Sequence, residues 1–222
     1  MNELLFLFHL LSITATTLIM LKMGAEALVA FLCVQAILAN LFVIKQITLF
    51  GFTATASDMY IVGSVLSLNL LQEYYGKHIA RKAIWISFVL LIFYTIVSQI
   101  HIFYIPSMSD FSHKYYYNLL SYMPRLTSAS IIVYLIVQHF DTHFYAVLKR
   151  LFEGKRLLLR NIISITVSQA LDTILFSLLG LYGIIDNIGQ VMLVAFTIKM
   201  ITMALLAPLV LCIKKYIQSD RV

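Results

Sequence analysis

The sequence predicts an all-α integral membrane protein, a polytopic helical bundle that forms one domain over residues 1–222. Of its residues, 61% are hydrophobic and only 12% are charged, whereas soluble domains carry about 25% charged residues. The mean hydropathy is +0.93. A helix needs about 20 residues to cross a hydrocarbon core about 30 Å thick. Stretches that can do so cover residues 4–21, 27–44, 59–75, 83–105, 126–148, 159–181 and 189–213.

The first stretch is expected to be a helix of the bundle and not a cleaved signal peptide. It begins Met1-Asn2-Glu3, which is acidic where a signal peptide is positive, and no small-residue cleavage site follows. The two cysteines, Cys33 and Cys212, lie in separate apolar stretches and fit neither a disulfide framework nor a metal spacing. We therefore expect both to be packing residues.

Positive charge alternates between the loops and predicts the orientation. One side of the membrane, including the C-terminus, holds 12 Lys and Arg residues, the other holds 3, and Lys199 is left inside the seventh stretch. Because cytoplasmic loops carry the excess of Lys and Arg, we expect the N-terminus outside and the C-terminus in the cytoplasm. The external loop 106–122 contains four tyrosines, which are typical of an interfacial aromatic belt; a substrate lid is the alternative.

Polar side chains interrupt the third stretch. Asn69, Gln72 and Glu73 are spaced i, i+3 and i+4, and Asp58 precedes Asn69 by 11 residues, which is about 20° away around an ideal helix. An ionisable side chain inside a spanning helix is costly unless it is paired or faces a wet cavity, so these residues are functional candidates. For Glu73 the alternative is an interfacial carboxylate that balances the basic residues from Lys77 onwards.

A polar stripe follows the sixth stretch from its cytoplasmic end. Its members are Asn161, Ser164, Ser168, Gln169 and Asp172. Asp172 lies 12 residues after Arg160, about 18 Å along a helix, which places it near or beyond mid-membrane. Interhelical hydrogen bonding explains the serines, but an aspartate at this depth favours a functional role.

The fifth stretch ends with Gln138 and Asp141, which share a helix face at i, i+3. His139 and His143 have the i, i+4 spacing of a metal-binding pair. Asp141 points elsewhere on a regular helix, so we predict no metal site.

Lys199, near the middle of the seventh stretch, is a candidate buried cation. Its natural partner is a buried carboxylate such as Asp172, and Asp58 is a further candidate for an ion pair or a coupling role. A structural salt bridge and a gating or coupling pair both stay open.

Several motifs are absent from the sequence. It contains no G-x-x-x-x-G-K-[ST], no H-E-x-x-H and no G-x-S-x-G, so we expect neither ATP hydrolysis nor intramembrane hydrolysis by this chain, and no cofactor. The net charge of +6 reflects cytoplasmic loops, and we expect no nucleic-acid partner.

The polar motifs, taken together, resemble those of the queuosine-precursor transporter family, which belongs with the vitamin-uptake-type membrane proteins. They are Asp58, Asn69-Leu70-Leu71-Gln72-Glu73, Gln138-x-x-Asp141 and Arg160-Asn161-x-x-Ser164-x-x-x-Ser168-Gln169-x-x-Asp172, and the match extends in this order to about Lys199. The architecture is similar to the six-helix substrate-binding subunits of energy-coupling-factor transporters. The resemblance therefore implies a six-helix core plus one extra N-terminal helix.

The resemblance also implies import of a 7-deazaguanine for tRNA queuosine modification, across the bacterial inner membrane. The cargo would be the cyano precursor, the aminomethyl precursor or queuine. A guanine-like edge presents two parallel N–H donors that suit one carboxylate, and a carbonyl that suits an amide or guanidinium donor. We expect Glu73 and Asp172 to line a central site, with an aromatic ring stacked on the base. Its other members would be Asn69, Gln72, Gln138, Asp141, Arg160, Asn161, Ser164, Ser168 and Gln169.

The expected partners are this small-molecule base and the lipid bilayer, and a homo-oligomer is possible. The main alternative is a substrate-capture subunit that needs a separate ATPase. An integral-membrane enzyme with Glu73 or Asp172 as general acid or base is another. A structural or assembly subunit is the last, and it would leave the polar stripe of the sixth stretch without a purpose.

Overall fold

The computed structural model describes residues 1–153 and 156–219, except for the side chains of residues 157, 158, 161 and 205–219. The long helices in this part of the chain are α1 (Asn2–Met23), α2 (Ala25–Phe42), α3 (Asp58–Tyr75), α4 (Lys77–Phe103), α6 (Met123–Leu151), α7 (Leu157–Phe176) and α8 (Ile188–Ser219). The shorter elements are α5 (His113–Leu120), the π-helical turn η1 (Ser177–Leu181) that prolongs α7, and the antiparallel strands β1 (Gln46–Leu49) and β2 (Phe52–Thr55).

The predicted all-α membrane fold is confirmed, since each predicted stretch coincides with a long helix. Among the described residues, five helical segments are apolar and long enough to cross a membrane: α1, α2, α4, the run α5–α6, and α7 with η1. The chain is a multi-pass membrane protein. Helix α3 is not among the five, because polar side chains occupy several of its 18 positions. The crossing of the membrane by α3 and α8 stays a prediction.

The sequence did not predict a strand pair between α2 and α3. Helix α2 ends at Phe42, and β1 and β2 form a hairpin in what was expected to be helix end and loop. Phe50 and Gly51 join the strands with φ of 50° and 83°, the pair of positive values that a two-residue hairpin turn of type I′ requires. Helix α4 begins at Lys77, six residues earlier than residue 83, because only Gly76 (φ 89°) separates it from α3.

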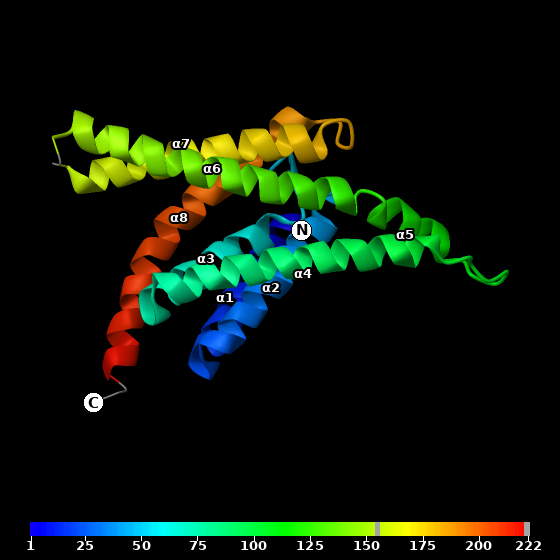
Figure 1. Cartoon of the computed structure of the whole chain (residues 1–222), viewed down its shortest axis with the longest axis horizontal. Helices are drawn as coiled ribbons and strands as arrows, with labels where there is room; N and C mark the ends of the chain where they lie inside the picture. The colour runs from blue at the N-terminus through cyan, green and yellow to red at the C-terminus, as the bar shows by residue number, and fades with distance from the viewer. Residues whose placement is uncertain (154–155, 220–222) are drawn as a thin grey trace.

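The long helices form two groups joined by α8. Helices α1 to α4 pack against one another, and α6 packs along α7, as Figure 1 shows. Helix α8 contacts both α3 of the first group and α7 of the second. Leucines such as Leu28, Leu66 and Leu70 fill the first group, and Met123, Leu126 and Leu181 pack in the second. Val43, just after α2, also belongs to the second cluster, and Tyr94 and Ile102 of α4 pack against it, so the two groups meet in a shared apolar core there.

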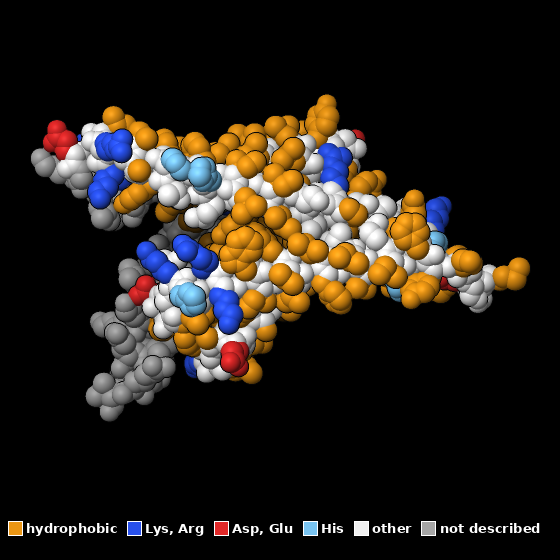
Figure 2. Space-filling model, viewed as in Figure 1, with side chains coloured by type: hydrophobic (Ala, Val, Ile, Leu, Met, Phe, Trp, Pro, Cys, Tyr) orange, Lys and Arg blue, Asp and Glu red, His pale blue; other side chains and the backbone are white. Residues whose placement is uncertain are grey.

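The outer surface is strongly apolar. Large side chains such as Phe8 on α1, Phe93 on α4 and Ile132 on α6 are exposed, and hydrophobic side chains cover much of the face in Figure 2. A soluble monomer rarely exposes so continuous an apolar surface. It is the surface expected of helices in contact with lipid tails.

Cys33 is buried in the first core, where a packing residue is expected. The side chain of Cys212 lies outside the described part of the chain.

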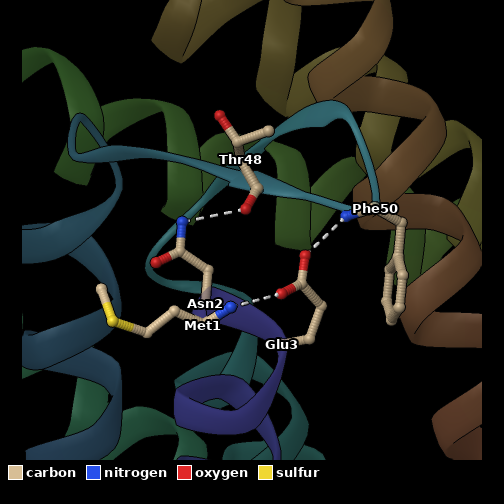
Figure 3. Close-up of polar contacts among 5 residues, drawn as sticks. All are labelled: Met1, Asn2, Glu3, Thr48 and Phe50. Atoms are coloured by element: carbon tan, nitrogen blue, oxygen red, sulfur yellow. Dashed lines mark hydrogen bonds and ion pairs between the residues drawn. The ribbon is translucent and has the colours of Figure 1, made fainter.

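The hairpin is held between the start of α1 and the start of α8. Figure 3 shows Glu3 accepting a hydrogen bond from the backbone N–H of Phe50 (3.1 Å) and Asn2 donating one to the carbonyl of Thr48 (3.0 Å). On the α8 side, Gln190 accepts a hydrogen bond from the N–H of Thr53 (3.1 Å). The additional N-terminal helix is therefore tied to the rest of the bundle by polar contacts as well as by packing.

The loop 106–122 contains α5, and its tyrosines Tyr115, Tyr116 and Tyr117 are exposed. Before α5, Asp110 accepts hydrogen bonds from the hydroxyl and the backbone N–H of Ser112, both at 2.7 Å. These bonds stabilise the carboxylate and hold the pKa of Asp110 below its ordinary value.

We predict that Gly63→Ala destabilises the first helix group. A Cβ at this position of α3 would lie 2.4 Å from both Gln35 Oε1 of α2 and Ile13 Cγ2 of α1, so packed neighbours would have to shift. Overpacking of this kind costs about 1–3 kcal/mol. Thermal unfolding of the purified protein in detergent measures the loss, and Gly189→Ala is the matched control because its Cβ would meet nothing within 4 Å. Equal stability of the two variants would contradict this packing.

Candidate functional site

A cavity of about 290 Å³ lies among α2, α3, α4, α6, α7 and α8. Much of its wall is apolar, with Ile61, Val65 and Val133 among the lining residues. The polar residues of the wall are Asn40, Ser57, Ser64, Ser87, Ser130, Tyr134, Asp172 and Lys199. Its volume is near the lower end of the range of about 300–1,000 Å³ for small-ligand sites, which typically combine apolar walls with a few polar groups.

An ion pair occupies one side of this cavity. Lys199 Nζ on α8 lies 2.6 Å from Asp172 Oδ2 on α7, and it also donates to Thr173 Oγ1 at 3.1 Å. The side chain of Lys199 is 10% exposed and that of Asp172 is 32% exposed. A cation buried in a bilayer needs such a partner, because desolvation of an unpaired charge is expensive. The pair thus links α7 to α8 at the wall of the cavity.

Asp58 is a second buried carboxylate, and it lies at the start of a helix that packs against α8. It begins α3, is only 4% exposed and receives hydrogen bonds from Thr55. Its Oδ2 atom is buried and has no hydrogen-bond partner among the described residues. Ile198, the residue before Lys199, packs against the apolar cluster that contains Met59, the residue after Asp58. Asp58 follows Ser57, which itself lines the cavity.

Three aromatic rings line the same cavity: Phe88 on α4, Tyr134 on α6 and Phe176 on α7. The rings of Phe88 and Tyr134 meet edge to face with centroids 5.1 Å apart. Phe176 follows Asp172 by four residues, so both lie on one face of α7. An aromatic ring and a carboxylate are therefore neighbours on one helix.

A polar contact crosses the cavity wall between α2 and α6. Ser130 donates to Asn40 Oδ1 at 3.0 Å, and Asn40 Nδ2 donates to the backbone carbonyl of Ala36 at 3.0 Å. Sequence reasoning missed Asn40 and Ser130, as it missed the three rings. Asn40 is an amide within an apolar stretch. It could have been found in the same way as Asn69, which was selected as a polar side chain inside a spanning stretch.

A second polar cluster joins α6 to α7 outside the cavity wall. Asp141 Oδ1 accepts hydrogen bonds from Ser164 Oγ (2.7 Å) and Ser168 Oγ (2.6 Å). Arg160 is 3% exposed and stacks on Tyr145 at 5.6 Å from the ring centroid. Its Nε and Nη1 atoms are buried without a partner in the described structure. The structure thus brings together the predicted residues Asp141, Arg160, Ser164 and Ser168.

The remaining predicted residues are distributed differently. Asn69, Gln72 and Glu73 on α3, and Gln138 on α6, are exposed, whereas Gln169 is half-buried. These five residues do not line the cavity that contains Asp172. The side chain of Asn161 lies outside the described part of the chain. The roles of all these residues stay predictions.

A notch opens at the end of the molecule where α6 passes into α7, as Figure 2 shows. The end of α3 and the start of α4 lie across from it (Figure 1), and Lys and Arg side chains gather on both sides. Its two sides therefore carry the basic chain segments that the positive-inside rule assigns to the cytoplasm.

A helical membrane bundle that encloses a small, partly polar cavity is the architecture of a membrane transport protein. The model of the family described as "Putative vitamin uptake transporter" matches residues 55–213. The chain belongs to this family.

The chain is also similar to a curated protein of Bacillus subtilis (strain 168) named "Probable queuosine precursor transporter". The two are 32% identical over 202 residues, which cover 90% of this chain and 87% of that protein. No solved structure is significantly similar to this chain.

We predict that Asp141→Ala loosens the contact between α6 and α7. The change removes the acceptor of two hydroxyl hydrogen bonds, and bonds to a charged group contribute about 1.5–3 kcal/mol each. The free energy of unfolding should fall by about 1.5–3 kcal/mol for each bond that is lost. Asp141→Asn retains an acceptor oxygen, so its free energy of unfolding should fall less. Chemical or thermal unfolding of the purified protein measures both. Asp186→Ala in an exposed loop is the control, and a loss no larger than this control would show that the cluster does not hold the two helices together.

Proposed function

We propose that this protein imports a queuosine precursor, a 7-deazaguanine base, and binds it in the cavity between the two helix groups. The observation that carries the proposal is the Asp172 carboxylate, which lines a mainly apolar cavity of about 290 Å³ together with aromatic rings. The name of the Bacillus subtilis relative supports the same cargo.

The cavity offers groups that match each part of the base. In this proposal Asp172 accepts the two parallel N–H donors of the guanine-like edge, because a carboxylate presents two acceptor oxygens in one plane. Asn40 and Ser130 hydrogen-bond the remaining polar edge. Phe176 stacks on the base, since it shares a face of α7 with Asp172, and base–aromatic stacking contributes about 1–3 kcal/mol.

In this proposal the other polar residues that the sequence predicted form the cytoplasmic route of the base. They are Asn69, Gln72, Glu73, Gln138, Asp141, Arg160, Asn161, Ser164, Ser168 and Gln169. The exposed members, Asn69, Gln72, Glu73 and Gln138, suit a path that a polar base crosses, because an amide or carboxylate can replace a hydrogen bond that the base made to water. Asp172 binds the base, and these residues release it.

Complementation in a bacterium tests whether the chain imports a queuosine precursor. The host lacks its own importer and cannot make queuosine precursors, but retains the enzymes that use each base. With the chain expressed, the cyano base, the aminomethyl base or queuine is supplied at low concentration, and queuosine is measured in tRNA. Restoration by at least one base is expected. If none restores queuosine although the protein is in the membrane, the chain needs a missing partner or carries another cargo.

We predict that Asp172→Asn lowers this uptake about 10- to 100-fold. The change replaces one of the two acceptor oxygens by a donor, and a hydrogen bond to a charged group is worth about 1.5–3 kcal/mol, where 1.4 kcal/mol corresponds to a factor of ten. Initial rates of labelled-base uptake, normalised to protein in the membrane, measure the effect. Asp186→Asn is the matched control for loss of a carboxylate, because Asp186 is exposed in a loop. Equal uptake by the two variants would show that Asp172 does not bind the base.

We also propose that the chain lies in the bacterial inner membrane with its N-terminus outside and its C-terminus in the cytoplasm. Single cysteines at Ser109 and His78, both exposed, test this in a background in which Cys33 and Cys212 are replaced by alanine. A membrane-impermeant maleimide should label the Ser109 position in cells with a permeable outer envelope, and the His78 position only after lysis. The reverse pattern would overturn the orientation.

A further inference from the structure

Lys199 already binds one oxygen of the Asp172 carboxylate that the base would need. The lysine lies 2.6 Å from Asp172 Oδ2, whereas a guanine-like edge contacts both oxygens of a carboxylate at once. With the lysine in place, the ammonium group and an N–H donor of the base would both approach Asp172 Oδ2, and their positively charged hydrogen atoms would repel each other. Bidentate binding of the base is therefore favoured if Lys199 leaves Asp172.

A second acceptor is available for the lysine. Asp58 Oδ2 is buried and has no hydrogen-bond partner among the described residues, although buried polar atoms in proteins are nearly always partnered. Helix α3, which begins with Asp58, packs against α8, and Ile198, next to Lys199, packs against the cluster that contains Met59, next to Asp58. Lys199 has a flexible four-carbon stem and three donors, which suit a turn of its ammonium group from α7 towards α3.

We propose that Lys199 is shared by two carboxylates: it pairs with Asp172 in the empty cavity and transfers to Asp58 when a ligand with two parallel N–H donors binds Asp172. The proposal rests on the proposed function for the nature of the ligand, but not for the sharing of Lys199. It makes Asp58 a positioning residue that acts on the ligand through Lys199.

The transfer of Lys199 couples binding of the base to the way in which α8 is linked to the two helix groups. In the empty state the lysine ties α8 to α7, and in the loaded state it ties α8 to α3 instead. Figure 1 shows α8 running between these two helices. Binding of the base thus releases an ionic link to one group and creates a link to the other.

The sharing of Lys199 is tested first without any ligand. Thermal stability is measured for the wild type, Asp58→Asn, Asp172→Asn and the double variant, each also in a Lys199→Met background. Each single variant leaves Lys199 one carboxylate, whereas the double variant leaves an unpaired buried cation. We expect the double variant to lose more than the sum of the singles, and we expect this excess to vanish in the Lys199→Met background. Additive losses in both backgrounds would overturn the proposal.

The transfer itself is tested by binding of labelled base to purified protein. Asp58→Asn should weaken binding at least about tenfold, because the displaced lysine has no acceptor. In the Lys199→Met background the same substitution should change the affinity less than about twofold. Lys199→Gln replaces Lys199→Met where the latter does not fold, and Asp186→Asn serves as the control.

The outcomes separate the two proposals. If Asp58→Asn binds the base like the wild type, or weakens binding equally with and without Lys199, the transfer is wrong. If the wild type binds none of the three bases, the proposed function fails, and the ligand-free measurement still decides whether Lys199 is shared.

Discussion

The structure depends on one constraint: a charge inside the bilayer must have a partner. Lys199 and Asp172 satisfy it for each other at 2.6 Å, and their pairing holds α8 against α7 next to the cavity. The Asp141 carboxylate meets the same need with hydroxyl groups of Ser164 and Ser168. Polar side chains that would be expensive in lipid are placed at helix–helix contacts, where they determine which helix faces inward.

The same constraint applies at the cavity, which lies where the two groups of helices face each other. One apolar cluster lies within α1 to α4, and a second joins the end of α2 and α4 to α6 and α8, whereas the wall of the cavity also carries polar groups. Asn40 and Ser130 meet there across the two groups, as do the rings of Phe88 and Tyr134. A site built between two bodies can change its shape when the bodies move, whereas a site inside one packed core cannot do so without loss of packing.

Hydropathy predicted the long helices because the bilayer demands both length and apolar composition. The positions of Asp172 and Lys199 within apolar stretches also suggested them as partners, and the structure places them in an ion pair. Other features depend on the tertiary arrangement. Asp58 and Asn69 share a face of an ideal helix, yet Asp58 is buried and Asn69 is exposed. Phe88, Tyr134 and Phe176 are apolar or aromatic residues of spanning stretches rich in such residues, where no periodicity distinguishes a ring on a cavity wall from one on a lipid face. The hairpin escaped prediction because its turn is Phe50-Gly51, without the Asn-Gly or Asp-Gly pair that signals a type I′ turn.

The charge of the ion pair also bears on how transport could be driven. When the cavity is empty, the charges of Lys199 and Asp172 cancel in their ion pair. Movement of the pair across the membrane would therefore do no electrical work. A neutral base leaves this balance unchanged, and its import would follow its own gradient, which incorporation into tRNA keeps steep. A base with an aminomethyl cation adds one positive charge, and the membrane potential favours its inward movement by about 2.3 kcal/mol per 100 mV. Under the proposed function, the side arm of the cargo therefore decides whether the membrane potential contributes to uptake.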